Sequence, residues 1–486
     1  MRLNGRSPPP RAEYMLRTKV VCTLGPATSS PDTVLSMVER GLDLARVNMS
    51  HGSREDHRAS IAAVRAASGK VGRPVGVMVD LSGPKIRVGE LPVPIDLVAG
   101  EIVVMAPQAV ATGDEIPTTY EPLASEIQEG DAVLLDDGNF ELRCVGTTGD
   151  RTRLEVVRGG LLKPRKGINL PLVNVQAPSL TEKDLSDLDF ALEQGAEYVA
   201  LSFVRSADDV IDLKRRVGGR ALVVSKIEKV QAVRAIEEIL SETDTVMVAR
   251  GDLGVELPFE RVPLAQKRII QLSNYYGRPV ITATQMLESM IENVRPTRAE
   301  ASDVANAILD GTDAVMLSGE TAVGKYPLEA LDAIVSIGAE IERSGFLERG
   351  PRYLTHPGLH SRGGASPREH AVAAATVDAV ARIGAPAIVV LTKSGFSARL
   401  VSSYRPSVPI FAVTPDPHTH RQLSAVWGVR PVLAAQVEMS YERQSAFGRQ
   451  AVIESEAGEP GASVPVTAGF PFYESGSTNT MRLERL

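Results

Sequence analysis

The chain has almost no cysteine and no long apolar run. Only Cys22 and Cys144 are present in 486 residues, and they are far apart in the sequence. This excludes a disulfide scaffold or a four-thiolate zinc site and fits a reducing cytoplasm. The longest apolar runs, such as Ala387–Leu391, fall far short of the roughly 18 residues that a membrane-spanning helix needs. We therefore expect a cytoplasmic protein with no membrane partner.

The chain also lacks an excess of positive charge. Its 53 Lys and Arg against 60 Asp and Glu give a net charge of −7, without an extended basic tract. This argues against a general nucleic-acid partner, although a local basic pocket for phosphates stays open. The first 14 residues have no apolar core, so they are not a secretory signal. We expect residues 1–14 to form a disordered extension.

Short β-branched strands alternate with amphipathic helices over the first two thirds of the chain. Ser30-Pro31 and Gly41 bound one of these helices, and Thr181 with Asp184 has the spacing of a capping box. Eight strands with helical crossovers are the number that closes a parallel (β/α)8 TIM barrel. The expected strands are Lys19–Thr23, Asp43–Val47, Val75–Val79, Glu197–Leu201, Ala221–Ser225, Thr245–Val248, Pro279–Thr282 and Asp313–Met316.

One crossover departs from this pattern. From about Gly89 to Gln176, apolar and polar residues alternate at period two, with turn signals at 137–139 and 148–150. The alternation predicts a small all-β barrel domain inserted into a barrel loop, on the face where barrel active sites form. We expect it to act as a lid.

A second α/β pattern follows an irregular stretch that ends near Pro367. The expected elements are helices at Glu369–Ile383, Phe396–Tyr404 and His418–Val426 and strands at Ala387–Leu391 and Pro409–Val413. The segment Val437–Ser463 has no interpretable pattern. The overall expectation is an α/β fold with barrel residues 15–88 and 177–346, inserted domain 89–176 and C-terminal α/β domain 347–486.

Polar residues gather where six of the barrel strands end. Barrel enzymes carry their reactive groups at the carboxyl ends of strands, so this pattern indicates an active site. The clusters are Arg46 to His51, Asp80, Lys226 to Glu228, Arg250 to Asp252, Thr284-Gln285 and Ser318 to Glu320.

The types of residue in these clusters favour phosphoryl transfer. Lys226 and Glu228 are two apart on one strand, so they face the same side. Glu228 and Asp252 offer the hard oxygen ligands that suit Mg²⁺ (or Mn²⁺). Arg46 and Lys226 add the positive charge that a transferring phosphoryl group requires. The alternative is a solvated salt bridge between Lys226 and Glu228.

Two further groups have open interpretations. Thr284, Ser318 and Glu320 form either a proton relay of hydroxyls and a carboxylate or a set of side chains that bond the backbone at strand ends. His51 is more often a packed or solvated histidine than a catalytic one.

Several long motifs occur together and in a fixed order. They run R-V-N-M-S-H-G from Arg46, D-L-S-G-P-K-I-R-V-G from Asp80, S-K-I-E-K from Ser225, M-V-A-R-G-D-L-G-V-E-L from Met247, T-A-T-Q-M-L-E-S-M from Thr282, then R-P-T-R-A-E and M-L-S-G-E-T-A within Pro296–Lys325 and its flank. These motifs resemble the pyruvate kinase family. The resemblance extends from about Lys19 to Ser477–Thr480.

The resemblance implies a reaction of phosphoenolpyruvate and ADP to pyruvate and ATP, the last step of glycolysis. It places Mg²⁺ on Glu228 and Asp252, and the transferring phosphoryl group beside Lys226 and Arg46. Backbone N–H groups of Gly251 and Asp252, with Thr284, would bind the substrate carboxylate. Ser318 and Glu320 would lie behind Thr284 on the route that protonates the enolate.

The resemblance also implies further ligands and partners. Arg87 and Lys183 match positions that contact nucleotide phosphates, and Pro26, Asn48 and His51 lie on the nucleotide side. The family further implies a homotetramer. Its members often bind a phosphorylated effector at the loop that corresponds here to Thr392, Lys393, Ser394, Gly395, Phe396 and Ser397. An ordinary capped turn is the alternative for this loop.

One position departs from many members of the family. Those members hold an activating K⁺ through residues that match Asn48, Ser50, Asp80 and the carbonyl of Leu81, and they carry Glu where this chain has Lys85. In carrying a lysine at this position, the chain resembles the potassium-independent branch of the family. The tethered ammonium would supply the positive charge that a bound K⁺ otherwise supplies. We therefore expect that K⁺ is not required.

Two other functions are conceivable. A Mg²⁺-dependent enolate lyase on a similar barrel could use Glu228 and Asp252, but it would not need Lys226 on a phosphoryl group or the nucleotide-side residues Arg87 and Lys183. A catalytically dead sugar-phosphate sensor would bind an effector without turnover.

Overall fold

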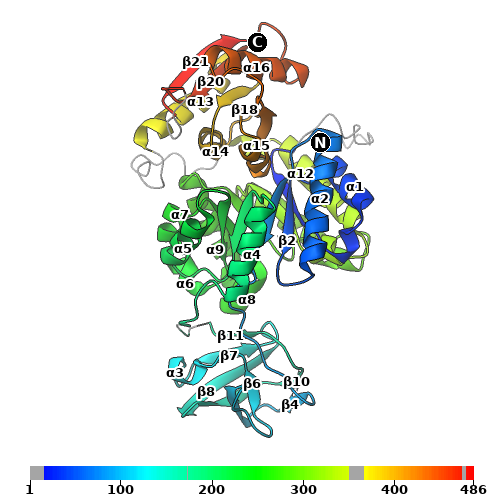
Figure 1. Cartoon of the computed structure of the whole chain (residues 1–486), viewed down its shortest axis with the longest axis vertical. Coiled ribbons are helices and arrows are strands. Elements are labelled where there is room, and N and C mark those ends of the chain that lie inside the picture. Colours follow the sequence, from blue (N-terminus) through cyan, green and yellow to red (C-terminus); the bar gives the residue numbers. More distant parts are fainter. Residues whose placement is uncertain (1–15, 172, 174, 350–365, 473–477) are drawn as a thin grey trace.

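The computed structural model describes residues 16–171, 173, 175–349, 366–472 and 478–486. The expected N-terminal extension lies outside these residues. Three parts follow one another along the long axis of the molecule: the inserted β domain, the barrel and the C-terminal sheet (Figure 1). Within the described ranges, no helix is long and apolar enough to cross a membrane.

Eight parallel strands close into the predicted barrel, in the order β1-β16-β15-β14-β13-β12-β3-β2. Several strands end one or two residues later than the sequence suggests, which brings Lys226 into its strand. The bounds are β1 Lys19–Thr23, β2 Leu44–Asn48, β3 Gly76–Asp80, β12 Tyr198–Leu201, β13 Leu222–Ile227, β14 Thr245–Ala249, β15 Val280–Ala283 and β16 Ala314–Leu317.

Helices surround the barrel and bury their apolar faces on its outer side. The predicted caps are present: Ser30 Oγ accepts the N–H of Thr33 at 3.0 Å, and Thr181 and Asp184 form the capping box. The helices are α1 Pro31–Arg40, α2 Arg54–Val71, α4 Glu182–Glu193, α5 Ala207–Val217, α6 Val230–Arg234, α7 Ile236–Glu242, α8 Arg250–Glu256, α9 Val262–Tyr275, α10 Arg298–Leu309, α11 Gly319–Ala322 and α12 Pro327–Arg343.

The inserted region is almost entirely β structure. Its main sheet has the order β11-β7-β8-β9-β5-β6, and the first and last strands are joined through isolated bridges of Arg87 with Gly167 and Val88 with Thr118. These bridges close the sheet into a small barrel. The elements are β4 Ile95–Leu97, β5 Ile102–Pro107, β6 Ile116–Thr118, α3 Leu123–Glu126, β7 Ala132–Leu135, β8 Phe140–Thr148, β9 Arg151–Arg158, β10 Gly160–Leu162 and β11 Ile168–Asn169.

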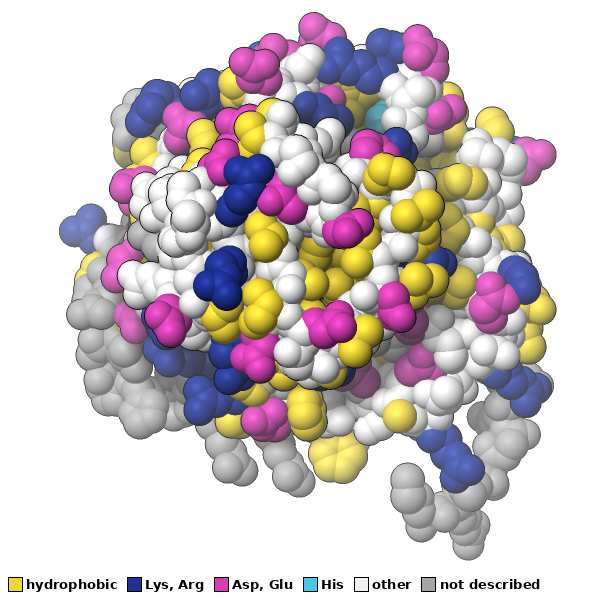
Figure 2. All heavy atoms as spheres, turned by 90° about the horizontal axis from the view of Figure 1, so that it is seen from below, with side chains coloured by type: hydrophobic (Ala, Val, Ile, Leu, Met, Phe, Trp, Pro, Cys, Tyr) yellow, Lys and Arg dark blue, Asp and Glu magenta, His cyan; other side chains and the backbone are white. Residues whose placement is uncertain are grey.

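Figure 2 looks onto the molecule from below, from the side of the inserted domain. Hydrophobic side chains and charged side chains of both signs are interspersed on this face. The exposed large apolar residues of the inserted domain are Val93, Val98, Ile102, Val110, Val157 and Leu161. Neither sign of charge dominates the face in this view.

The C-terminal part holds a five-stranded sheet in the order β19-β18-β17-β20-β21. The predicted helix at His418–Val426 is shorter, since it passes into a 3-10 turn at Leu423–Ala425, and the uninterpreted segment after Val437 contains a helix. The elements are α13 Pro367–Ile383, β17 Ile388–Leu391, α14 Phe396–Ser403, β18 Ile410–Thr414, α15 Pro417–Gln422, β19 Val429–Leu433, α16 Tyr441–Glu454, β20 Ser463–Ala468 and β21 Thr480–Arg485. The domain limits inferred from the sequence stay predictions.

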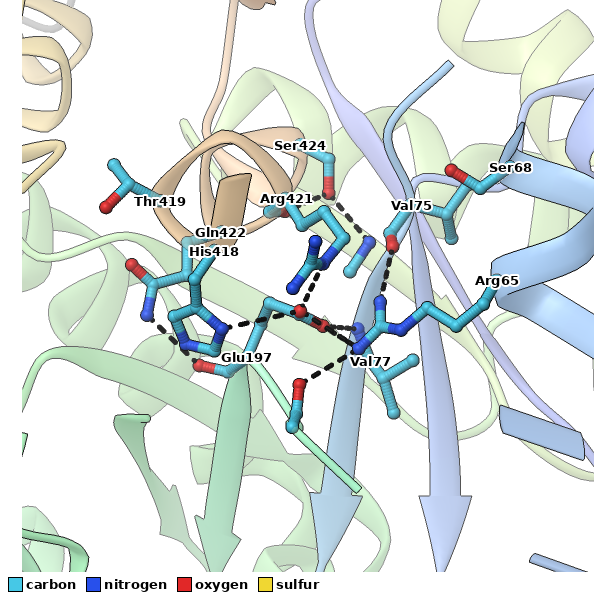
Figure 3. Close-up of polar contacts among 12 residues, drawn as sticks. Arg65, Ser68, Val75, Val77, Glu197, His418, Thr419, Arg421, Gln422 and Ser424 are labelled. Atoms are coloured by element: carbon cyan, nitrogen blue, oxygen red, sulfur yellow. Dashed lines mark hydrogen bonds and ion pairs between the residues drawn. The ribbon is translucent and has the colours of Figure 1, made fainter. Parts of the chain in front are cut away.

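A buried carboxylate joins the C-terminal part to the amino end of the barrel. Glu197, just before β12, is fully buried. Its carboxylate accepts hydrogen bonds from Arg65 Nη2 of α2 at 2.8 and 2.9 Å. It also accepts the N–H of Val77 in β3 at 2.7 Å. From α15, Arg421 donates to it at 2.6 Å and His418 lies 3.7 Å away (Figure 3). One side chain therefore ties two barrel strands to α15.

Substitution Glu197→Gln should destabilise the protein. The change leaves two partly buried guanidinium groups without the buried anion that pairs them, and breaking a buried ion pair costs at most about 3–5 kcal/mol. We expect a lower midpoint of thermal unfolding, followed by circular dichroism. Glu193→Gln, at an exposed position of α4, is the control. Equal midpoints for the two variants would contradict this role of Glu197.

Candidate active site

The alternation of each strand places polar side chains at the carboxyl end of the barrel interior. Leu44, Met78, Ala200 and Val224 fill the inside of the barrel. Two residues further along each strand or its extension, the same inward side carries a polar group. These groups are Arg46, Asp80, Ser202 and Lys226.

Lys226 lies at the centre of this group. Its ammonium is 2.8 Å from Glu228 Oε1, 3.3 Å from Asp80 Oδ1 and 2.7 Å from Ser202 Oγ. Burial by itself would lower the pKa of Lys226, but Asp80 and Glu228 outweigh it, so the pKa lies above its usual value. The ammonium therefore stays charged. Lys226 and Glu228 form the ion pair that the alternative interpretation named, but it is buried rather than solvated.

Asp80 joins Lys226 to Arg46. Its Oδ2 accepts Arg46 Nε at 2.7 Å, while its other oxygen faces Lys226. Burial would raise the pKa of Asp80, yet the attraction of Lys226 and Arg46 prevails and the pKa lies below its usual value. Arg46 also donates to Thr23 Oγ1 at 3.0 Å. Both cations are thus held in fixed positions by one carboxylate.

Glu228 and Asp252 fit a hard divalent cation. Glu228 Oε2 accepts the N–H of Phe203 at 2.7 Å, and Oε1 faces Lys226. Burial, with repulsion from nearby Asp252, raises the pKa of Glu228 despite Lys226. Such repulsion between two carboxylates is what a bound cation relieves. Two carboxylates alone would leave positions for water and substrate oxygens, as Mg²⁺ prefers.

Thr284 lies in an unusual turn beside α8. Its φ is +67° and that of Gln285 is +54°, a conformation that is rare for a β-branched residue and costs about 1–3 kcal/mol per residue. Thr284 Oγ1 accepts the N–H of Gly251 at 2.7 Å and donates to the carbonyl of Ala283 at 2.7 Å. The turn is therefore tied to the start of α8, next to Asp252.

The three members of the expected proton relay do not bond one another. Glu320 accepts the backbone N–H groups of Ser318 at 2.7 Å and Leu287 at 3.0 Å. Ser318 Oγ is buried and has no partner among the described residues. The contacts of Thr284 and Glu320 go to the backbone, and both interpretations of this group stay predictions.

The nucleotide-side candidates lie on several elements around the same end of the barrel. Lys183, near the start of α4, donates to the carbonyl of Met49 at 2.7 Å and lies 2.5 Å from Asp187. Asn48 Oδ1 accepts the N–H of Ser50, and the carbonyl of Asn48 accepts the N–H of His51. Two further candidates belong to other segments, Pro26 to a 3-10 turn after β1 and Arg87 to the segment that closes the inserted barrel.

Two of the groups expected at a K⁺ site, Asp80 and the carbonyl of Leu81, have contacts within the chain. The carbonyl of Leu81 accepts Ser202 Oγ at 2.7 Å, and both oxygens of Asp80 face cations. Lys85 is exposed, and within the described part of the chain its ammonium has no hydrogen-bond or ion-pair partner. It lines a pocket together with Asp252.

This pocket lies between the barrel and the inserted domain. The barrel contributes Asp252, Lys85 and Phe203, and the inserted domain contributes Asp137 and Asn169. The turn that contains Asp137 also approaches α8, since a Cβ on Gly138 would stand 3.6 Å from Val255. The inserted domain is thus positioned over the carboxyl end of the barrel.

Comparisons with known proteins decide the family. The chain matches the family models described as pyruvate kinase, barrel domain, over residues 15–331 and pyruvate kinase, alpha/beta domain, over residues 370–484. A pyruvate kinase from Mycobacterium intracellulare is 44% identical over 475 residues, which are 97% of this chain and 98% of the relative. This chain belongs to the pyruvate kinase family.

Other members agree with this assignment. A pyruvate kinase from Corynebacterium efficiens is 43% identical over 476 residues, covering 97% of this chain and 98% of the relative. The solved structure of a pyruvate kinase from Cryptosporidium parvum has a TM-score of 0.88 at 33% identity, with 97% of this chain and 96% of that chain covered. The reaction of the family, from phosphoenolpyruvate and ADP to pyruvate, follows from membership. Neither the lyase nor the dead sensor is supported by these relatives.

The sequence did not predict two residues with contacts in this pyruvate kinase site, Ser202 and Phe203. Ser202 touches both Lys226 and the Leu81 carbonyl, and Phe203, at φ +56°, presents its N–H to Glu228. The period of β12 could have indicated Ser202, whereas nothing in the sequence marks a backbone N–H as a partner. The loop Thr392 to Ser397 lies between β17 and α14 as expected, with Ser397 Oγ 2.7 Å from Thr478 Oγ1.

Substitution Asp80→Asn should lower turnover although Asp80 contacts no expected substrate atom. The neutral amide releases Lys226 and Arg46 from their common anion, and loss of such a supporting partner typically costs about 10- to 100-fold in activity. Steady-state kinetics at saturating substrates would measure the effect. Asp96→Asn, at an exposed position of β4, is the control. A wild-type rate for Asp80→Asn would contradict the positioning role.

Proposed function

We propose that this chain is a Mg²⁺-dependent pyruvate kinase that does not require K⁺. The observation that carries the proposal is the buried arrangement of Lys226 between Asp80 and Glu228, with Arg46 on the far side of Asp80. Two fixed cations beside two carboxylates that suit a divalent metal are the arrangement that phosphoryl transfer needs.

In this proposal, Glu228 and Asp252 hold Mg²⁺, which would neutralise charge on the phosphoryl oxygens when bound. Lys226 stabilises the phosphoryl group during transfer and Arg46 binds the substrate phosphate. Because Asp80 and Glu228 fix Lys226 in advance, no reorganisation of its charge is needed during the reaction. Mn²⁺ suits the same oxygen ligands.

The carboxylate of phosphoenolpyruvate would lie between the start of α8 and the Thr284 turn. N–H groups of Gly251 and Asp252 and the hydroxyl of Thr284 would receive it. The Gly251 N–H donates to Thr284 Oγ1, so the carboxylate would replace that oxygen as the acceptor of the Gly251 N–H. Thr284, with Ser318 and Glu320 behind it, would lie near the route of the proton to the enolate.

The nucleotide would lie under the inserted domain. We assign Arg87 and Lys183 to its phosphates and Pro26, Asn48 and His51 to its side of the pocket. Since the pocket is lined from both the barrel and the inserted domain, closure of that domain would exclude water, so that the phosphoryl group passes to ADP.

We assign K⁺ independence to Lys85. Lys85 lines the pocket that Asp252 also lines, and in this proposal its ammonium supplies the positive charge of an activating ion. The carbonyl of Leu81 and the carboxylate of Asp80 already have donors in the fold. With Asn48 and Ser50, these are the groups that would otherwise hold the ion.

A homotetramer and a phosphorylated effector complete the proposal. The edge strand β21 has exposed side chains, and Phe259 and Leu264 are 85% and 69% exposed, which offers surfaces for association between copies. Sedimentation at a mass other than four chains of 52.0 kDa would contradict the tetramer. The loop Thr392 to Ser397 would bind the phosphate of the effector, and Ser394→Glu should abolish activation by whichever sugar phosphate activates the wild type.

The decisive experiment is pyruvate formation from phosphoenolpyruvate and ADP with Mg²⁺ in a K⁺-free buffer. We expect turnover, and we expect added K⁺ to change it little. Lys85→Glu should make turnover depend on K⁺, because the substitution removes the tethered cation and adds a carboxylate that can help to hold the ion. Lys163→Glu, at an exposed lysine of the inserted domain, is the control.

Each result has a distinct meaning. Wild-type turnover that requires K⁺ would refute the role of Lys85 alone, as would a Lys85→Glu variant that ignores K⁺. Absence of turnover under all conditions, with Mg²⁺, K⁺ and sugar-phosphate or AMP effectors supplied, would refute the pyruvate kinase activity itself.

A further inference from the structure

Arg250, the first residue of α8, links the two segments that form the carboxylate side of the site. Its Nη2 donates to the carbonyl of Thr284 at 2.8 Å and lies 3.4 Å from that of Gln285. Its Nη1 lies 2.7 Å from Asp303 Oδ2 of α10. The Arg250 side chain is only 10% exposed, whereas that of Asp303 is 38% exposed.

The turn that receives Arg250 needs support. Thr284 and Gln285 both have positive φ, and such backbone persists only where its surroundings hold it. Two contacts from α8 do so: the Gly251 N–H on Thr284 Oγ1, and the Arg250 guanidinium on the two carbonyls. The conformation of the turn therefore depends on where the guanidinium points.

Asp303 determines where it points. One terminal nitrogen of the planar guanidinium bonds the turn, and the other bonds Asp303. The second nitrogen also donates a hydrogen bond to Oε1 of Gln266 in α9, at 3.3 Å. A charged partner on α10 orients the fork, which a neutral side chain would do less well. Asp303 is 38% exposed at its side chain, and the hydrogen bonds and ion pair of Arg250 go to the Thr284 turn, Gln266 and Asp303.

We propose that Arg250 and Asp303 are a positioning pair that keeps the Thr284 turn in the shape that binds the carboxylate of phosphoenolpyruvate. The proposal rests on the function proposed above. It predicts an effect on phosphoenolpyruvate rather than on ADP, because the nucleotide-side residues Arg87 and Lys183 come from other segments. The pair acts through Thr284 and touches no reacting atom.

The test is equilibrium binding by calorimetry with Mg²⁺ present. Each substrate is titrated alone, so that no reaction occurs. Asp303→Ala should weaken phosphoenolpyruvate binding about tenfold, as loss of a supporting partner does elsewhere, and leave ADP binding within about twofold. Arg250→Lys should weaken it further, because an ammonium cannot bridge the turn and Asp303 together.

The matched control is Asp212→Ala. Asp212 of α5 is also an aspartate paired with an arginine on a helix, at 3.0 Å from Arg216 and with 35% side-chain exposure. It lies on the outside of the barrel away from Thr284, so both substrates should bind as in the wild type. Asp303→Asn keeps the shape of the side chain and should show a smaller loss in the same direction, which covers the case that Asp303→Ala fails to fold.

Three results would overturn the proposal: equal weakening of both substrates by Asp303→Ala, unchanged binding of phosphoenolpyruvate by folded Asp303→Ala or Asp303→Asn, or the same loss in Asp212→Ala. Failure of the wild type itself to bind phosphoenolpyruvate would instead refute the underlying function. The wild-type titration therefore separates the two claims.

Discussion

The polar end of the barrel interior is organised around one buried ammonium and the carboxylates that surround it. Lys226 has Glu228 on one side and Asp80 on the other, and removal of either partner would leave a buried charge uncompensated. Asp80 in turn holds Arg46, and Glu228 stands near Asp252. The positions of the proposed metal ligands and of the two cations proposed to bind the phosphate are therefore coupled through a single ionic cluster.

The same strands that carry this cluster anchor the rest of the molecule at their other end. In β3, Val77 bonds Glu197 at the amino end, and Asp80 lies three residues further on. In β12, Tyr198 donates to the carbonyl of Gln422 in the C-terminal part, and Ser202 follows the strand beside Lys226. The inserted domain covers the carboxyl end (Figure 1). The C-terminal part and the candidate site are thus joined through two short strands, β3 and β12.

Sequence patterns predicted the architecture because it follows from local periodicity. The alternation along β9 and the caps at Ser30 and Thr181 are each visible within a few residues. The period of two also predicted that Lys226 and Glu228 face one cavity. The contacts among Asp80, Ser202 and Lys226 could not be predicted in this way, because they join separate strands at a register that only barrel closure sets. The left-handed turn at Thr284 was equally invisible, since neither Thr nor Gln signals positive φ. The segment after Val437 gave no helix signal because its apolar residues are few, although α16 forms there by packing on the sheet.

The measurement that tests this account most directly compares turnover with metal binding in Lys226→Met. If Lys226 stabilises the transferring phosphoryl group, kcat should fall by about 10²- to 10³-fold, as for loss of one preorganised stabilising group. The affinity for Mn²⁺, measured by electron paramagnetic resonance without substrate, should change far less, because Glu228 and Asp252 remain. Lys226→Arg, which keeps the charge, verifies that the fold tolerates substitution here. Turnover at the wild-type rate in Lys226→Met, or loss of metal binding as large as the loss of turnover, would contradict the central role of this ammonium.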